Sequence, residues 1–325
     1  MHRVITTISL FVAASLGAPS LHTRKTFDFT GVTVIGDSLC DDGRAPGSAW
    51  LFTNRTLPAD PNYFNSTARR FSNSYVWTER LAGKLGVPLT DYAVGGATSN
   101  NSFVPGVLGS FIVPDALQQY AKLTAALASE PKDISKELFI VYIGGNDGIQ
   151  SVENNLNPNR TITYDEEQVG QRIVSVIEWI VSHLIHSVGV KHLFLSTTPN
   201  TSRTPLGSTL GSGIQTYQTS MNSYYYPYIE ELKLSIASAG VELTFVDYYN
   251  AMDPVFDDPT GYNFSAGATV PCVVGTYGES GYSLCSTDPD VQDTHFFWDY
   301  VHPTGPGHEI IAQIGYNALS TTYGV

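Results

Sequence analysis

The chain has 325 residues, of which 42% are hydrophobic and 14% charged, so it can bury a large core and is not of the disordered or fibrous class. Its formal net charge of −13 argues against nucleic acid and anionic membranes as partners. The sequence has no Pro/Ser-rich linker, abrupt change of composition or internal repeat that would divide it into domains.

The first element along the chain has the features of a secretory signal. Arg3 supplies a positive charge, residues 5–16 form an apolar core, and a small-residue cleavage site follows. The apolar core is too short for a stable membrane anchor, and no later segment has about 18 uninterrupted apolar residues. We therefore expect a signal peptide at residues 1–18 and one secreted, extracellular domain at 19–325, which we take to be monomeric.

Asn-x-Ser/Thr sequons agree with an exported, glycosylated protein. Used sequons have to lie on the surface. The six candidate asparagines are Asn54, Asn65, Asn100, Asn159, Asn200 and Asn263.

The main body of the chain alternates predicted strands and helices. Short runs of β-branched and apolar residues predict strands at 32–35, 89–94, 138–143, 191–196 and 241–246. Start and stop signals predict helices at 74–84, with Ser74 as the N-cap, at 114–128, 165–188 and 215–238, and from about 306 onward. This alternation predicts an α/β fold, a three-layer α/β/α sandwich around a parallel five-stranded sheet. Two stretches, 41–71 and 253–297, do not fit it, and long loops of this kind are usually functional.

Three cysteines leave one without a partner. Cys272 and Cys285 lie in a glycine-rich segment and could form a local disulfide in an oxidising compartment. Cys40 is then unpaired, and a free cysteine is most often a small buried hydrophobe.

Ser38 follows the first predicted strand, within Gly36-Asp37-Ser38-Leu39. A serine at the carboxyl edge of a sheet is placed where open α/β folds have their sites. Serine is a weak nucleophile by itself, so it needs a base and a group that stabilises an oxyanion.

His302 is the best candidate for that base. Asp299 precedes it by three residues, so the carboxylate can hold the imidazole in one tautomer. Read alone, Asp-x-x-His also fits a histidine that caps a helix. His183 and His186 have a spacing that can bind metal, but no further ligand pattern accompanies them, and we interpret them as helix residues at an interface.

The turns after the second and third predicted strands can supply oxyanion donors. Gly96 allows a backbone N–H to approach a ligand closely, and Asn146 offers a side-chain amide. Each of these turns read alone is an ordinary turn. Because they follow parallel strands, both donors should meet Ser38 at one edge of the sheet.

These motifs together resemble the GDSL, or SGNH, hydrolases. Gly36-Asp37-Ser38-Leu39 is similar to the family's first block, Gly96 to the second, Gly144-x-Asn146-Asp147 to the third, and Asp299-x-x-His302 to the fifth. Arg70-Phe71-Ser72-Asn73 and the residues around His302 look like the branch of plant and fungal GDSL esterases and carbohydrate esterase family sixteen. Asp91 departs from that branch, where asparagine is frequent, and we expect this change to affect a turn.

The resemblance implies a flavodoxin-like sandwich and a serine esterase. Ser38 would be the nucleophile, His302 the base and Asp299 its orienting acid, while Ser38 N–H, Gly96 N–H and Asn146 would form the oxyanion hole. It implies no metal and no organic cofactor. The Gly-x-Ser-x-Gly elbow of α/β-hydrolases and the His-Glu-x-x-His string of zinc proteases are both absent from the sequence.

The substrate is open between two kinds of ester. Secretion, acidity and the resemblance favour removal of acetyl groups from plant-wall oligosaccharides, with a small ester or acetylated oligosaccharide as partner. The alternatives are a lipid acyl hydrolase and a secreted binding protein without catalysis. Aromatic residues in the two long stretches could stack on sugar rings or line an acyl pocket: Trp50, Phe52, Tyr63, Phe64, Tyr262 and Phe264.

Overall fold

The central feature of the fold is a parallel β-sheet of five strands. The computed structural model describes residues 26–44, 48–49, 69–275 and 283–325. The strands are β1 (Gly31–Gly36), β2 (Leu89–Asp91), β5 (Glu137–Tyr142), β6 (His192–Ser196) and β7 (Glu242–Val246). Their order in the sheet is β2-β1-β5-β6-β7, and all neighbours are parallel. All five predicted strands are confirmed, and the order is that of a flavodoxin-like sheet.

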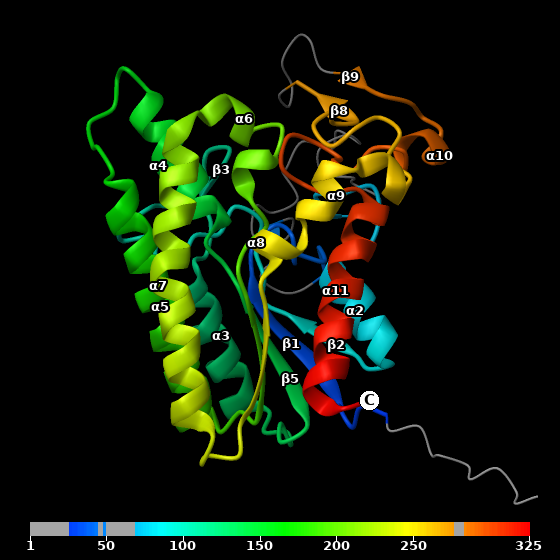
Figure 1. The fold of residues 1–325 in the computed structure, drawn as a ribbon. Helices are drawn as coiled ribbons and strands as arrows, with labels where there is room; N and C mark the ends of the chain where they lie inside the picture. Colours follow the sequence, from blue (N-terminus) through cyan, green and yellow to red (C-terminus); the bar gives the residue numbers. More distant parts are fainter. Residues whose placement is uncertain (1–25, 45–47, 50–68, 276–282) are drawn as a thin grey trace, which may run out of the picture.

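Helices cover both faces of the sheet (Figure 1). One core contains residues of α3 (Ala116–Ser129), α4 (Gly145–Leu156), α5 (Glu166–His183) and α7 (Ser212–Ile236). The other core contains residues of α2 (Trp77–Leu85), α8 (Tyr248–Ala251), α9 (Asp253–Asp257) and α11 (Gly305–Tyr323). The predicted three-layer α/β/α sandwich is therefore confirmed.

The alternation of side chains explains why the strands lie between two cores. In β5, Leu138 and Ile140 enter the core beneath α2 and α11, whereas Phe139 and Val141 enter the core beneath α5 and α7. Successive side chains of a strand point to opposite faces. Central strands that are covered on both faces therefore become continuous apolar runs.

Small elements decorate the carboxyl edge of the sheet. Two hairpins are formed by β3 (Val107–Leu108) with β4 (Phe111–Ile112) and by β8 (Val273–Val274) with β9 (Ser283–Leu284). The short helices there are α6 (Gly207–Leu210) and α10 (Pro289–Gln292), and the 3-10 turns are Thr201–Arg203 and Pro259–Tyr262. At the opposite edge, a π-helical turn at Leu184–Val188 leads from α5 into β6. Several short elements of the long stretch at 253–297, from α9 to α10, thus give its described part secondary structure of its own.

Two details differ from the expectation. No helix is predicted after the third strand, where residues 144–147 read alone form an ordinary turn, but the structure has helix α4 there, which begins with the weak helix formers Gly145 and Asn146. Ser74 does not cap α2, which begins at Trp77. The Glu79 carboxylate instead accepts the Val76 N–H at 3.1 Å, and the Ser74 hydroxyl accepts a hydrogen bond from Arg80.

The cysteines occupy two environments. Cys272 and Cys285 form a disulfide, and the Cys40 thiol is buried. No helix in the described ranges is long and apolar enough to cross a membrane. The expected signal peptide, Asn54 and Asn65 lie outside the described residues.

Candidate active site

Ser38 lies in a tight turn directly after β1. The Asp37 carbonyl accepts the N–H groups of Cys40 and Asp41, both at 3.0 Å, and the Asp37 carboxylate accepts the Leu39 N–H at 3.1 Å. A Cβ atom at Gly36 would lie 3.0 Å from the Cys40 sulfur, so the turn needs glycine there. These contacts hold Ser38 at the carboxyl edge of the sheet, where it is 5% exposed.

Ser38, His302 and Asp299 form a continuous hydrogen-bonded chain. His302 Nε2 lies 2.7 Å from Ser38 Oγ, and His302 Nδ1 lies 2.7 Å from Asp299 Oδ2. The other oxygen of Asp299 accepts the N–H groups of Val301 and His302, both at 2.8 Å. Asp299 therefore holds both the ring and the backbone of His302, and all three side chains are nearly buried.

The segment 70–73 packs against His302 and Pro303. The Phe71 ring stacks on the His302 ring with centroids 5.1 Å apart, and Ser72 Oγ donates to the Pro303 carbonyl at 2.9 Å. A Cβ at Gly95 would lie 2.2 Å from the Phe71 ring, so the glycine makes room for it. Reasoning from sequence assigned Phe71 no role at the site, and its only signal was the resemblance of Arg70-Phe71-Ser72-Asn73 to a known branch.

The three expected oxyanion donors lie at the same edge. Ser38 follows β1, Gly96 follows β2 with a φ of +82°, and Asn146 lies in the first turn of α4 after β5. Among the described residues, the N–H groups of Ser38 and Gly96 donate to no other group. One side-chain N–H of Asn146 donates to the Ala97 carbonyl at 2.9 Å. Because a side-chain amide has two N–H groups, the second can donate to a ligand.

A buried carboxyl group links the segments that carry the expected oxyanion donors Gly96 and Asn146. Asp147 accepts hydrogen bonds from the N–H of Ser99, at 2.9 and 3.0 Å, and from its hydroxyl at 2.6 Å. This contact links α4 to the loop that follows Gly96. Burial raises the pKa of Asp147 to about 7, and burial likewise raises the pKa of Asp37 to about 7.

Asp41 and Asp91 connect the turn after Ser38 to the turn after β2. Asp41 accepts the N–H of Gly95 at 2.8 Å, and Asp91 accepts the N–H groups of Asp42 and Ala93, both at 2.8 Å. Burial raises the pKa of Asp41 to about 6 and the pKa of Asp91 well above its usual value. Asp91 thus hydrogen-bonds to the expected turn at Ala93 and also to Asp42, in the segment that follows Ser38.

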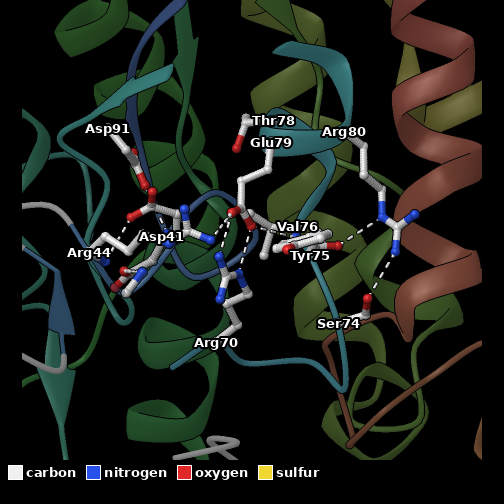
Figure 2. Close-up of polar contacts among 12 residues, drawn as sticks. Asp41, Arg44, Arg70, Ser74, Tyr75, Val76, Thr78, Glu79, Arg80 and Asp91 are labelled. Carbon is white, nitrogen blue, oxygen red and sulfur yellow. Dashed lines mark hydrogen bonds and ion pairs between the residues drawn. The ribbon is translucent and has the colours of Figure 1, made fainter. Parts of the chain in front are cut away.

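A polar network centred on Glu79 lies next to Asp41 and Asp91 (Figure 2). The Glu79 carboxylate receives both Arg44, at 3.3 Å, and Arg70, whose Nε lies 2.6 Å from Glu79 Oε2. Within the described ranges, oxygens of Asp41, Asp42 and Asp91 lie within 4.8 Å of one another, which is the one grouping there with the spacing of a metal site. Backbone N–H groups donate hydrogen bonds to all three of these carboxylates.

An apolar cavity of about 50 Å³ adjoins the reacting residues. Its walls include Leu39, Gly145 and Val301, which are chain neighbours of Ser38, Asn146 and His302, together with Ile149 and Phe297. A wider groove of about 850 Å³ runs beside α2 and β2, and none of the five site residues lines either hollow. Because its walls include chain neighbours of three site residues, the small cavity is the better placed of these two to receive part of a substrate held at Ser38.

The other candidate residues lie elsewhere. His183 lies in the last turn of α5, stacks on Trp179 at 3.8 Å and contacts Tyr120 of α3, which agrees with a helix residue at an interface, whereas His186 is exposed. Phe264 is 1% exposed and packs against Phe296, so it cannot stack on a sugar. Tyr262 is exposed, and the remaining aromatic candidates, Trp50, Phe52, Tyr63 and Phe64, lie outside the described residues.

The described sequons differ in exposure. Asn159 and Asn263 are exposed. Asn100 and Asn200 are half-buried, and each side-chain oxygen accepts an N–H two residues further on. The first two are therefore the more accessible sites for a glycan.

Comparison with known proteins gives one family and several distant relatives. The model of the GDSL-like lipase/acylhydrolase family matches residues 32–314. The chain is 25% identical to the thermolabile hemolysin of Vibrio parahaemolyticus over 87% of this chain, but spans only 62% of the hemolysin's length. It is 23% identical to a GDSL esterase/lipase of Arabidopsis thaliana over 94% of this chain and 95% of the relative.

Similarity to solved structures is weaker. An active-site mutant of a family two carbohydrate esterase from Clostridium thermocellum aligns over 93% of this chain and 66% of its own, with a TM-score of 0.46 and 13% identity.

Proposed function

Since the chain belongs to the GDSL-like lipase/acylhydrolase family, we propose that it hydrolyses carboxylic esters with Ser38 as the nucleophile. The observation that carries this proposal is the chain of two 2.7 Å contacts from Ser38 through His302 to Asp299. A serine, a base and an orienting acid in this order are what acyl transfer requires.

The proposed reaction proceeds in two halves. His302 Nε2 takes the proton of Ser38 Oγ as the oxygen attacks the ester carbonyl, and the same proton leaves with the alcohol. The oxyanion of each tetrahedral intermediate would receive N–H groups from Ser38, Gly96 and Asn146. Water then attacks the acyl-enzyme with His302 as its base, which releases the acid and restores Ser38.

Replacement of the nucleophile tests this mechanism. We expect Ser38→Ala to lower kcat/KM on a soluble acetate ester by about 10⁴-fold or more, because no other group can form the acyl-enzyme. Ser129→Ala, at the exposed end of α3, is the matched control and should keep wild-type activity. A loss of only about tenfold for Ser38→Ala would exclude Ser38 as the nucleophile.

For the substrate we propose a short acyl group, with acetylated plant-wall oligosaccharides as the first candidate. The small volume of the cavity beside Leu39 and Val301 supports a short acyl group. The expected secretory signal and acidity support an extracellular role for the enzyme. Acetylated xylo-oligosaccharide should therefore be turned over faster than long-chain esters, and faster turnover of chains beyond about C8 would exclude this candidate.

One observation favours a lipid acyl hydrolase as the second candidate. The β3–β4 hairpin next to Gly96 exposes Val107, Phe111 and Ile112 to solvent. An exposed apolar group at the rim of an esterase site suits an ester carried by a lipid.

A further inference from the structure

The β3–β4 hairpin is an uncharged element on a strongly acidic chain. Residues 103–114 contain no charged side chain, whereas the whole chain has a net charge of −13. Ile112 is 61% exposed, Val107 45% and Phe111 37%. Exposed apolar side chains that gather on one element mark an interaction surface more often than scattered ones do.

The backbone of the hairpin divides its side chains between two faces. Val107 pairs with Ile112 and Leu108 pairs with Phe111, so each pair shares one face. Leu108 packs against the core, while the Val107–Ile112 pair faces away from it. Gly109 begins the two-residue loop with a φ of +59°, as a tight hairpin of this length requires.

The hairpin is attached to the proposed oxyanion site. A Cβ at Gly96 would lie 3.1 Å from the Val107 carbonyl and 3.4 Å from the Leu108 side chain. Gln150 of α4 accepts the Val107 N–H at 3.2 Å and donates to the Gly96 carbonyl at 3.4 Å. The hairpin therefore lies between α4 and the turn that follows β2, and Figure 1 shows β3 next to α4. The small cavity is lined by residues that follow β1, β5 and β6, among them Leu39, Gly145 and Thr198.

We propose that the β3–β4 hairpin docks the protein on a neutral lipid surface and so brings esters of that surface to Ser38. The inference rests on the proposed esterase function and deepens its second candidate. The acyl group enters the cavity, and the alcohol extends past Gly96 toward the hairpin and the lipid.

The net charge of the protein and the exposed area of the hairpin favour a neutral lipid surface as its binding partner. An acidic protein is repelled by an anionic bilayer, and no cation of the hairpin offsets that repulsion, so the surface has to be neutral. A stable dimer buries about 1,000 Å² or more in total, and three partly exposed side chains on two-residue strands fall well short of this area. Shallow insertion of a few apolar side chains into a lipid interface needs no such area.

The test compares the outward pair of the hairpin with a matched apolar residue elsewhere. Val107→Ser/Ile112→Ser removes the pair, and Leu234→Ser replaces an 81% exposed leucine in the last turn of α7, at the amino end of the sheet. Binding is measured by co-sedimentation with phosphatidylcholine vesicles. Activity is measured on hexadecyl acetate in those vesicles and on ethyl acetate in solution, which carry the same acyl group.

We expect the double variant to lower the vesicle partition coefficient, and the ratio of hexadecyl to ethyl acetate activity, by about tenfold or more. Leu234→Ser should keep both values within about twofold of wild type. Val107→Leu/Ile112→Leu should restore the binding that the serine variants lose.

Several outcomes would overturn docking. The proposal is wrong if wild type and the double variant bind vesicles equally, or if Leu234→Ser loses as much binding as the double variant. It is also wrong if the wild type prefers phosphatidylserine vesicles, or if the protein is a dimer that only the double variant dissociates. Failure of the esterase proposal is distinguishable, because the wild type would then hydrolyse neither acetate. The Ser38→Ala variant keeps the hairpin unchanged, so it should bind vesicles as the wild type does.

Discussion

At the scale of single residues, the site depends on buried polar groups that are hydrogen-bonded to one another and to the backbone. Asp299 uses one oxygen for the His302 ring and the other for two backbone N–H groups, and rotation of the imidazole would break the ring contacts to Asp299 and Ser38. A carboxylate buried with good hydrogen bonds is an effective positioning group, because a broken bond in the interior is not replaced by water. The same argument applies to Asp147 and Ser99 on the oxyanion side.

The side chain of Asn146 provides the clearest mutational test of the oxyanion site. We expect Asn146→Ala to lower kcat on a soluble ester by about 10²- to 10³-fold, because one donor to the developing oxyanion is lost. Asn317→Ala, on the exposed face of α11, is the control. If kcat of Asn146→Ala stays within about tenfold of wild type, Asn146 does not stabilise the oxyanion.

The raised pKa of Asp147 predicts a pH effect with a definite sign. The folded protein keeps the Asp147 proton up to about pH 7, whereas the unfolded chain releases it near pH 4. Between these values the folded state binds more protons, so the Asp147 carboxyl makes the free energy of unfolding fall as pH rises. The side chain of the Asp147→Asn variant does not titrate, so this pH dependence is absent from the variant.

The free energy of unfolding of Asp147→Asn should therefore rise relative to wild type between pH 5 and 7, by at most about 1.4 kcal/mol per pH unit. Urea denaturation of both proteins at pH 5, 6 and 7 measures this difference. A difference that is constant or shrinks with pH would contradict the buried, protonated state of Asp147.

At the scale of elements, α4 is the helix that brings Asn146, the proposed oxyanion donor, to the carboxyl edge of the sheet. It begins directly after β5 and packs its Gly148 against Tyr217 of α7, whose hydroxyl donates to the Gly144 carbonyl. The close approach of the two helices depends on the missing side chain. The glycine therefore sets where Asn146 and Asp147 lie.

Two glycine substitutions separate this packing from helix propensity. A Cβ at Gly148 would lie 2.0 Å from the Tyr217 ring, whereas nothing lies within 4 Å of one at Gly83 on the exposed face of α2. We expect Gly148→Ala to lower the free energy of unfolding by about 1–3 kcal/mol through overpacking. Gly83→Ala should raise it by about 0.5–1 kcal/mol. Urea denaturation measures both, and equal effects would mean that α4 and α7 are not tightly packed at Gly148.

The strands were easier to predict than the helices that carry the site. Each strand is a local run of apolar residues, and that signal needs no knowledge of neighbours. Helix α4 lacks such a run, since its sequence is mostly polar and contains three glycines or asparagines in its first turn. Its stability comes from packing on α5 and α7, which no local pattern reports.

At the scale of the whole molecule, a disulfide braces the long segment that precedes His302. Cys272 and Cys285 close a loop of sequence separation 13, and Cys272 and Val273 donate N–H groups to the carbonyls of Phe297 and Trp298. The disulfide segment is thus paired with the strand-like residues that lead into the catalytic loop. The disulfide therefore also restrains the backbone of Phe297 and Trp298, which precede Asp299 and His302.

Removing this disulfide should destabilise the whole domain. Cys272→Ser/Cys285→Ser releases a short loop, and the chain-entropy model predicts a loss of about 3 kcal/mol from the free energy of unfolding. Cys40→Ser should show no dependence on reductant beyond that of wild type. Thermal unfolding with and without dithiothreitol measures both effects. A double variant as stable as oxidised wild type would show that the disulfide does not hold this segment.

The sequence by itself determined the layered α/β fold, the five strands and the expected identity of the reacting residues, because apolar periodicity and short motifs are local properties. Only the tertiary structure decided how they meet. Ser38 and His302 are 264 residues apart, and their 2.7 Å contact follows from the strand order and from Phe71 and Asp299 around the imidazole. The exposed hairpin beside Gly96 and the cavity beside Val301 likewise depend on which surfaces remain uncovered once the layers have packed, and exposure is a property of the assembled molecule.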